Sequence, residues 1–236
     1  MVKLTIIKND CKQIVREPIV MMLFLSPLLI AVVFRVLMDF LLPVIFQYFN
    51  HSFLPYKPYG LAFALIFCPM MLGVVMGFLM MEDKDAKVIE LMSITPLAKR
   101  GYIQNRMAFT CLATFIHAVF SYLIIGQYIL PFSSFLGLTA ILCLMALVVG
   151  FVFFSLADDK VKALTYAKGL NLIVIFAFSD LLKGDFIKIA AWFFPTYWVA
   201  KIIQTPDHFL YFLYATLSAL VWLVAIMLAG RWKWND

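Results

Sequence analysis

Charged residues are scarce in this sequence, and their scarcity excludes several classes of protein. Only 14% of the 236 residues are Asp, Glu, Lys or Arg, whereas 65% are hydrophobic. Soluble domains carry about 25% charged and roughly 45–50% apolar residues, so this chain has too few charges to cover a water-facing surface. An aromatic content of 17% excludes a disordered chain as well. The composition therefore predicts a polytopic membrane protein, with a mean hydropathy of +0.99.

Motifs for metal binding and hydrolysis are also missing. The four cysteines form no C-x-x-C pair, and none of the three histidines is followed by glutamate. The sequence therefore contains neither the ligand spacing of a zinc site nor the H-E-x-x-H motif of a zinc protease. No Gly-Lys dipeptide occurs, so the chain lacks the phosphate-binding loop of an ATPase. We therefore expect no catalytic residue, no metal site and no cofactor in this chain.

Six apolar runs have about the length of a membrane-spanning helix. About 20 apolar residues cross a hydrocarbon core of roughly 30 Å. Runs near this length occur at residues 19–42, 59–81, 107–130, 135–157, 169–182 and 209–230. The fifth run is short, and another apolar stretch, 186–200, follows it. The sequence predicts an all-α integral membrane protein, a single domain over residues 1–236 with six spans and re-entrant helices before the sixth.

The basic residues predict the orientation of these spans. Most of the 19 Lys and Arg residues fall on the side of the two termini. The other side carries only Arg35, Lys57, Lys183, Lys188 and Lys201. The positive-inside rule places both termini in the cytoplasm, in agreement with an even number of spans. The net charge of +6 thus reflects orientation in the cell (inner) membrane, and we expect no nucleic-acid partner.

Two short amphipathic helices are predicted outside the spans. Residues 2–17 place apolar side chains on one helical face and Lys8, Lys12 and Arg16 on another, as in a helix on the cytoplasmic leaflet. This helix is either an anchor or an element that transmits force. The second helix, residues 82–95, has acidic residues in its first turn, where the helix dipole favours anions. An anionic leaflet repels such a helix, so docking into a protein groove fits better than a headgroup-surface position.

Three features together resemble a known family. An interfacial helix leads into six spans, a Phe194-Pro195-x-Tyr197-Trp198 element precedes the last span, and the acidic segment ends in Glu90-Leu91-Met92-Ser93-Ile94-Thr95-Pro96-Leu97. This combination resembles the membrane subunit of type 2 ABC exporters, a family that includes drug and antibiotic-peptide export permeases. A glycine that the family often has before this segment is absent, and Lys87-Val88-Ile89 stands in its place.

The resemblance implies partners and a mechanism. In this family the helix after the second span is a coupling helix, which docks on a separate ATP-binding subunit. The resemblance implies two copies of that subunit, which bind ATP and Mg²⁺, and a second permease subunit in a homo- or heterodimer within the lipid bilayer. Closure of the ATPase dimer would then rock the spans. The implied ATPase-coupling residues are Val88, Glu90, Leu91, Met92, Thr95 and Pro96.

Five polar residues in the spans are candidates for a substrate path or its exit. Ionisable groups inside a membrane are functional candidates by default. His117 lies near the middle of the third span, where it either bonds to a neighbouring helix or contacts substrate. Arg35 and Asp39 either form an interfacial ion pair or line the exit, and Asn171 and Asp180 either bond across helices or face a lumen.

Two other functions stay open from the sequence alone. An ion-coupled secondary transporter needs ionisable groups at the middle of the membrane, and His117 is the one clear candidate. A non-transporting membrane scaffold is the other alternative. Co-purification with an ATP-binding subunit would separate both alternatives from an exporter permease.

Overall fold

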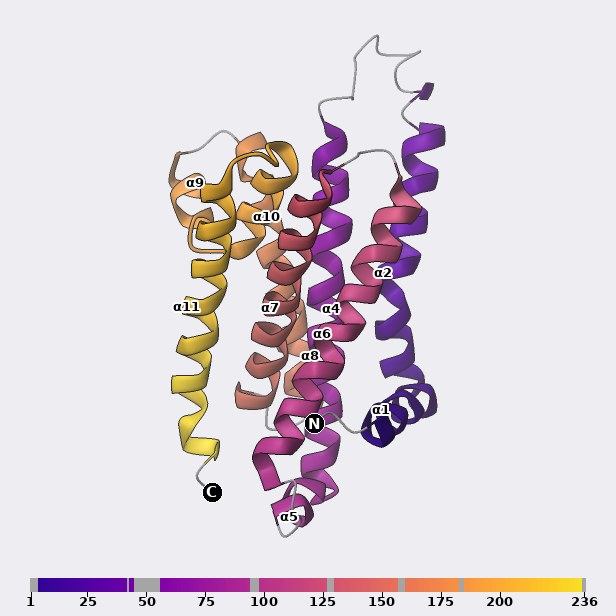
Figure 1. Ribbon diagram of the computed structural model, residues 1–236, viewed down its shortest axis with the longest axis vertical. Helices are drawn as coiled ribbons and strands as arrows, with labels where there is room; N and C mark the ends of the chain where they lie inside the picture. The colour runs from indigo at the N-terminus through magenta and orange to yellow at the C-terminus, as the bar shows by residue number, and fades with distance from the viewer. Residues whose placement is uncertain are drawn as a thin grey trace.

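The computed structural model describes residues 4–41, 43–44, 56–93, 98–126, 130–156, 160–182 and 185–234. Within these ranges the secondary structure is helical and contains no strand, which confirms the all-α class. The helices are α1 (Leu4–Arg16), α2 (Pro18–Val36) with a π-helical extension η1 (Leu37–Leu41), α4 (Lys57–Asp85), α5 (Val88–Ser93), α6 (Ala98–Ile125), α7 (Phe132–Leu156), α8 (Lys160–Leu172) with a 3₁₀ extension η3 (Ile173–Leu181), α9 (Asp185–Ala191), α10 (Pro195–Gln204) and α11 (Phe209–Trp234) (Figure 1).

Five helical segments of the described chain are long and apolar enough to cross a membrane. They are Pro18–Leu41, Lys57–Asp85, Arg100–Ile125, Phe132–Leu156 and Phe209–Ala229. They coincide with five of the six predicted spans. The remaining predicted span, 169–182, falls on the end of α8 and on η3, which follow each other directly but are each too short to cross alone. The six-span count therefore stays a prediction.

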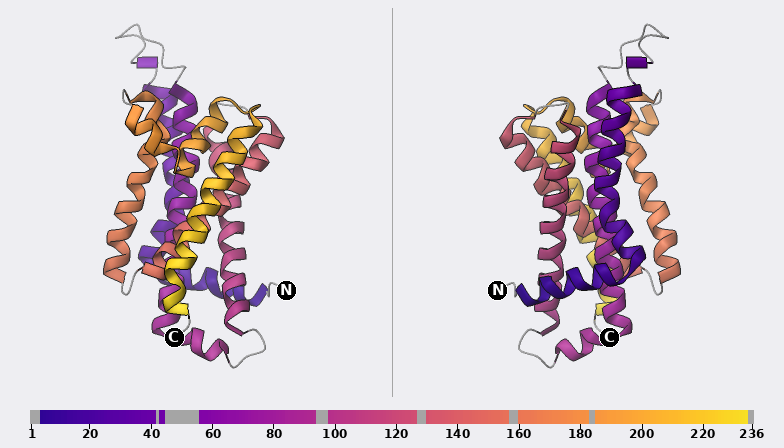
Figure 2. Two further views of the ribbon diagram at one scale, coloured as in Figure 1. Left: turned by 90° about the vertical axis from the view of Figure 1, so that its left-hand side faces the viewer. Right: turned by 90° about the vertical axis from the view of Figure 1, so that its right-hand side faces the viewer.

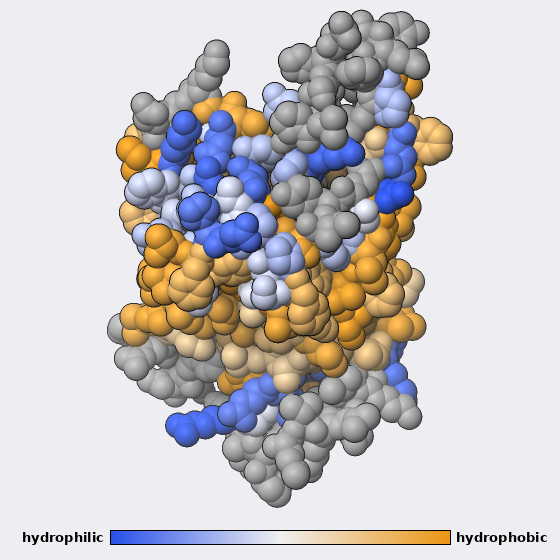
Figure 3. All heavy atoms as spheres, turned by 45° about the horizontal axis from the view of Figure 1, so that its top comes forward, coloured by the Kyte–Doolittle hydropathy of each residue, from blue (hydrophilic) through white to orange (hydrophobic). Residues whose placement is uncertain are grey.

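Helix α4 is the central element of the bundle. Its most apolar stretch is 89% buried, against 17% for the corresponding stretches of α2 and α11. Helices α2, α6, α7 and α10 pack around α4, and α2 and α11 lie at opposite edges of the bundle (Figure 1). On the face drawn in Figure 3, apolar residues form a band with hydrophilic residues above and below it. A band of this kind is the surface that a bilayer requires.

The two ends of the bundle carry different short helices. Helices α1 and α5 lie at one end, the α5 end, and helices α9 and α10 lie at the other, the α9 end (Figure 1). Helix α1 runs across the long helices instead of along them (Figure 2). It occupies the segment for which the sequence predicts an interfacial helix. The apolar stretch 186–200 overlaps α9 and α10, which lie where re-entrant helices are expected.

The expectation of one helix over residues 82–95 needs a correction. Helix α4 continues to Asp85, a turn follows at Ala86 and Lys87, and α5 begins only at Val88. Lys87 adopts a left-handed φ of 56°, which breaks the helical path. The acidic residues therefore lie in the last turn of α4, where the helix dipole disfavours anions, and not in a first turn. Contacts from other helices compensate at Asp83.

Candidate functional site

A buried cluster of charged side chains joins three helices at the α5 end. Arg106 of α6 and Asp10 of α1 are each 3% exposed, and Asp83 of α4 is also buried. One guanidinium nitrogen, Nη1 of Arg106, lies 2.8 Å from Oδ1 of Asp10. The other, Nη2, forms an ion pair with the carboxylate of Asp83. A single cation thus holds two buried carboxylates from different helices.

Polar side chains surround the cluster and add hydrogen bonds. The hydroxyl of Tyr102 donates to Oδ2 of Asp83 at 2.6 Å. Arg106 Nη2 donates to Oε1 of Gln13 at 3.2 Å, and Gln13 Nε2 donates to Oε2 of Glu82 at 3.0 Å. Buried ions are tolerated when they are paired and hydrogen-bonded in this way. Helix α1 is therefore attached to α4 and α6 through two of its side chains.

Helical spacing explains why these side chains meet. Asp10, Gln13 and the buried Ile14 recur at i, i+3 and i+4 on α1, so they share the face turned to the bundle. Tyr102 and Arg106 are i, i+4 on α6. The sequence analysis missed this cluster, although an acidic residue between Ile7 and Ile14 on an apolar face was a detectable signal. Cys11, the residue after Asp10, is exposed.

The buried position of Asp10 raises the pKa of its carboxyl group to about 6. Desolvation is the largest cause, and nearby Asp83 adds to it, whereas Arg106 acts in the opposite direction. The docked carboxyl group therefore binds its proton more tightly than the same group does in water, where its pKa is 3.8. By linkage, docking of α1 gains stability as the pH falls from 6 to 3.8, and this stability is lost as the pH rises back through 6.

We expect this linkage to appear in hydrogen exchange. Protection of the α1 amides, corrected for the intrinsic pH dependence of exchange, should increase between pH 6 and pH 4, by up to about tenfold per pH unit. Asp10→Asn keeps the side-chain shape and removes the titration, so its protection should not change with pH. The measurement is exchange mass spectrometry in detergent micelles. Equal pH dependence in the wild type and in Asp10→Asn would contradict this account.

The cluster holds the two helices that flank α5 in the chain. Asp83 lies just before α5, and Tyr102 and Arg106 lie just after it. Ile89 of α5 packs against a core cluster that includes Tyr102, whereas Leu91 is 61% exposed. A short helix is thus fixed by one apolar residue and presents another one outward.

The predicted coupling residues occupy different positions around α5. Val88 is half-buried and Leu91 is exposed. Glu90 and Met92 belong to α5, but their side chains lie outside the described part of the structure. Thr95 and Pro96 lie outside the described residues altogether. Leu91 is therefore the predicted residue that the structure places on an open surface.

Arg35 and Asp39 form an ion pair near the α9 end. Nε of Arg35 lies 2.6 Å from Oδ2 of Asp39, and both side chains are partly exposed. Nη1 of Arg35 also donates to the backbone carbonyl of Ile125 at 2.6 Å. Since Ile125 is the last residue of α6, Arg35 satisfies a carbonyl that the helix itself leaves free. The predicted ion pair is thus present and also caps a helix, whereas its place at the membrane interface or at an exit stays a prediction.

The other predicted path residues do not converge with this pair. His117 is buried, its Nδ1 lies 2.9 Å from the carbonyl of Ala113, and its ring meets Phe24 of α2 edge to face. Asn171 is half-buried near the end of α8. Asp180 pairs with Lys201 of α10, with Oδ2 2.7 Å from Nζ. The role of these residues in a substrate path stays a prediction.

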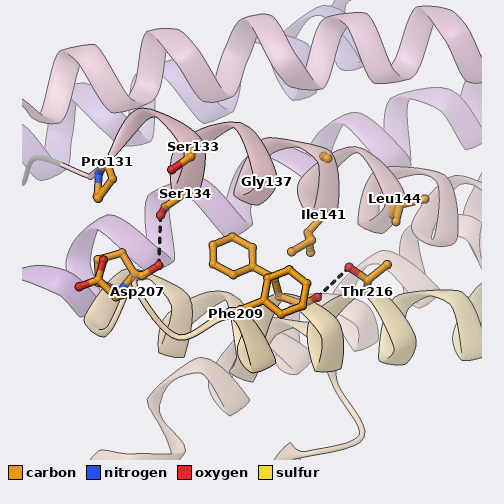
Figure 4. Close-up of a pocket in the computed structure, with 12 residues that line it drawn as sticks. Pro131, Ser133, Ser134, Gly137, Ile141, Leu144, Asp207, Phe209 and Thr216 are labelled. Carbon is orange, nitrogen blue, oxygen red and sulfur yellow. Dashed lines mark hydrogen bonds between the residues drawn. The ribbon is translucent and has the colours of Figure 1, made fainter.

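Two hollows lie at the α9 end of the described chain. The first, about 580 Å³, lies between the beginnings of α7 and α11 (Figure 4). Phe209 extends into it from α11, and Ser134 of α7 donates to the carbonyl of Pro206 at 3.1 Å. The second hollow, about 1030 Å³, lies between α11 and the α9–α10 hairpin and is mostly aromatic.

Comparison with known proteins gives one family. Residues 10–229 match the family model described as fluoroquinolones export permease protein Rv2686c-like. Two Mycobacterium tuberculosis proteins, fluoroquinolones export permease protein Rv2686c of strain H37Rv and MT2760 of strain CDC 1551, are each 21% identical to this chain over 212 residues. The alignments cover 85% of this chain and 81% of each relative. No solved structure matches the chain.

Proposed function

Because the chain belongs to the Rv2686c-like family of fluoroquinolones export permeases, we propose that it is the membrane subunit of an ATP-driven exporter and couples to a separate ATP-binding subunit through α5. The family match confirms the resemblance to ABC exporter permeases. The chain is accordingly a multi-pass membrane protein of a transport family.

The proposal includes an orientation and a stoichiometry. Helix α8 with η3 is the fifth of six spans, both termini are cytoplasmic, and the α5 end faces the cytoplasm. Two permease subunits, identical or related, flank the path, and two ATP-binding subunits supply the ATP and Mg²⁺ sites. The predominance of basic residues on the side of the termini supports this orientation.

The single observation that carries the coupling role is the buried cluster around Arg106. The cluster joins the end of α4 to the start of α6, and α5 lies between these two helices in the chain. It also joins both helices to α1. A displacement of α5 therefore moves α4 and α6 together, and α1 moves with them. Closure of the ATPase dimer would push on α5. The joined helices α1, α4 and α6 would then move as one rigid unit and transmit the displacement to the spans. This favours α1 as a force-transmitting element over a passive anchor.

Charging the outward residue of α5 tests the proposal. Leu91→Glu should weaken association with the ATP-binding subunit at least about tenfold, because burial of a leucine is worth roughly 1.5–3 kcal/mol and 1.4 kcal/mol is a factor of ten. Membrane insertion should survive, since Leu91 lies beyond the end of α4. The measurement is a pull-down of the co-expressed ATP-binding subunit from detergent at equal permease expression.

Gln104→Glu is the matched control for this pull-down. Gln104 is exposed on α6 at the same end, and the isosteric change adds the same charge outside α5. The control should retain the ATP-binding subunit as well as the wild type does. Equal recovery by Leu91→Glu would show that α5 is a lipid-surface helix or a scaffold element and would reject the docking role.

A further inference from the structure

The smaller hollow at the α9 end is a groove with one polar end and one apolar end. It has a volume of about 580 Å³ and lies between the beginnings of α7 and α11. Asp207 and Ser133 lie at one end of it (Figure 4). Leu144 and Thr216 lie at the other end, where the hydroxyl of Thr216 is already bonded to the carbonyl of Phe212 at 2.7 Å. We refer to this hollow as the α7–α11 groove.

The length of the α7–α11 groove matches the thickness of one leaflet. Ser133 and Leu144 are eleven residues apart on α7, which corresponds to about 16 Å of helix. One leaflet contributes half of a hydrocarbon core of roughly 30 Å. Because α7 comprises 25 residues, the groove ends near the middle of the helix. A packed helix of a second protein would follow α7 further, whereas a lipid acyl chain ends at the middle of the bilayer.

The α7–α11 groove opens to the surface of the bundle. A Cβ atom added at Gly137 would lie 2.9 Å from Cε1 of Phe212, so this ring of α11 lies directly against the backbone of α7. Ala140 of α7 and Phe209 of α11 also line the groove, and both are exposed. Since α11 lies at the edge of the bundle and its apolar stretch is only 17% buried, that surface faces the hydrocarbon of the bilayer.

Asp207 is the one charged residue that lines the α7–α11 groove. Its side chain is exposed, and the ion pairs of the described chain do not include it. Ser134 donates to the carbonyl of Pro206 at 3.1 Å, whereas the neighbouring Ser133 is exposed. A carboxylate at the polar end of an apolar groove attracts a cationic amine and repels an anionic headgroup.

We propose that the α7–α11 groove binds a phospholipid with an amine-bearing headgroup of no net charge, with one acyl chain in the groove and the ammonium group on the carboxylate of Asp207. The groove supplies the length and the apolar surface for the chain, and Asp207 selects the headgroup. An ammonium group has three N–H donors, which Asp207 and the hydroxyl of Ser133 accept. The site goes beyond the proposed export function, and only its assignment to the outer leaflet rests on the proposed orientation.

Filling the α7–α11 groove tests whether a lipid occupies it. Ala140→Phe places a ring in the groove and should weaken binding of palmitoyl-oleoyl phosphatidylethanolamine at least about tenfold, because the acyl chain loses its apolar contacts. The measurement is native mass spectrometry of detergent-purified protein titrated with this lipid. Ala229→Phe is the matched control, since Ala229 is an exposed alanine of α11 outside the groove, and it should bind as the wild type does. Equal binding by all three proteins would reject the site.

Removing the charge of Asp207 tests the choice of headgroup. Asp207→Asn should bind phosphatidylethanolamine about fivefold more weakly than the wild type does, as expected for the loss of an exposed ion pair. Its affinity for palmitoyl-oleoyl phosphatidylglycerol, which is anionic and has no amine, should not fall. Asp207→Glu keeps the charge and should retain most of the binding. Comparison of each variant with the wild type cancels binding of the anionic lipid to basic residues elsewhere. Equal changes for the two lipids, or none, would overturn the role of Asp207.

Two other occupants are outcomes of the same measurements. If a second copy of the chain fills the groove, Ala140→Phe changes the oligomeric state in size-exclusion chromatography and leaves lipid binding unchanged. If the carboxylate binds amines without help from the groove, free ethanolamine displaces the lipid at an equal concentration. Either result overturns the proposal. Because lipid binding is measured without nucleotide or an ATP-binding subunit, loss of this site leaves the Leu91 pull-down unaffected, and the two proposals fail separately.

Discussion

Replacing Arg106 with methionine should lower the free energy of unfolding by about 3–5 kcal/mol, because it leaves the buried carboxylates of Asp10 and Asp83 without their cation. The attraction that offsets their desolvation is lost, and Tyr102 and Gln13 lose a donor as well. Thermal unfolding in detergent micelles, followed by circular dichroism, measures the change. Coupling to the ATP-binding subunit should fall with it, since α1 loses its attachment.

Companion variants separate charge from packing at this site. Arg106→Lys keeps the charge, but a single ammonium group cannot bond to both carboxylates as the planar guanidinium group does. The stability of this variant should therefore lie between those of the wild type and Arg106→Met. The triple variant Arg106→Met, Asp10→Asn, Asp83→Asn removes all three charges and should recover most of the loss. A change below about 1 kcal/mol in Arg106→Met alone would mean that the cluster is not what holds α1 to the bundle.

Local patterns in the sequence predicted the helices that cross the bilayer. Apolar runs near 20 residues marked α2, α4, α6, α7 and α11, because the bilayer imposes the same requirement on every span. The segment 169–182 was predicted as a short fifth span, but no single helix covers it: Lys168 precedes it, Asn171 interrupts it, and η3 continues it as a 3₁₀ helix. Hydropathy measures composition and is insensitive to the kind of helix.

Contacts between distant segments were not predictable from such patterns. In the sequence, the acidic residues at positions 82–85 resembled the favourable first turn of a helix. They lie instead in the last turn of α4, where the helix dipole disfavours anions, and Asp83 is stabilised there by its partners on α6. Arg106 was counted as one of many basic residues on the cytoplasmic side. Its buried position depends on Asp10, which is far away in the sequence. The apolar face of α1 could have marked Asp10 as buried, but no periodicity identifies Arg106 as its partner.

The tight packing of α4 against α7 was equally hidden in the sequence. A Cβ atom added at Gly73 would lie 2.5 Å from Cβ of Val149 and 2.7 Å from the backbone oxygen of Ala146. Neither atom is the end of a flexible side chain, so the two helices would have to separate. Gly73 is thus required by the close approach of α7 and not by backbone conformation.

Gly73→Ala should therefore destabilise the protein by about 1–3 kcal/mol, the usual cost of overpacking a core. The sign of the stability change is informative, because alanine in place of glycine stabilises a helix by roughly 0.5–1 kcal/mol when space allows. Gly169→Ala in α8 is the matched control, since its Cβ would meet no atom within 4 Å. It should be neutral or slightly stabilising. Thermal unfolding of both variants in the same detergent gives the comparison.

A second-site change makes this prediction sharper. Val149→Ala removes the two methyl groups of the valine but keeps its Cβ, which is the nearest atom to the added methyl group. It should therefore rescue little of the loss in Gly73→Ala. Full rescue would mean that side-chain crowding, and not the approach of the α4 and α7 backbones, makes glycine necessary at position 73. If Gly73→Ala instead matches Gly169→Ala, the packing of α4 against α7 is looser than the structure shows, and α4 is not the rigid centre on which the coupling proposal depends.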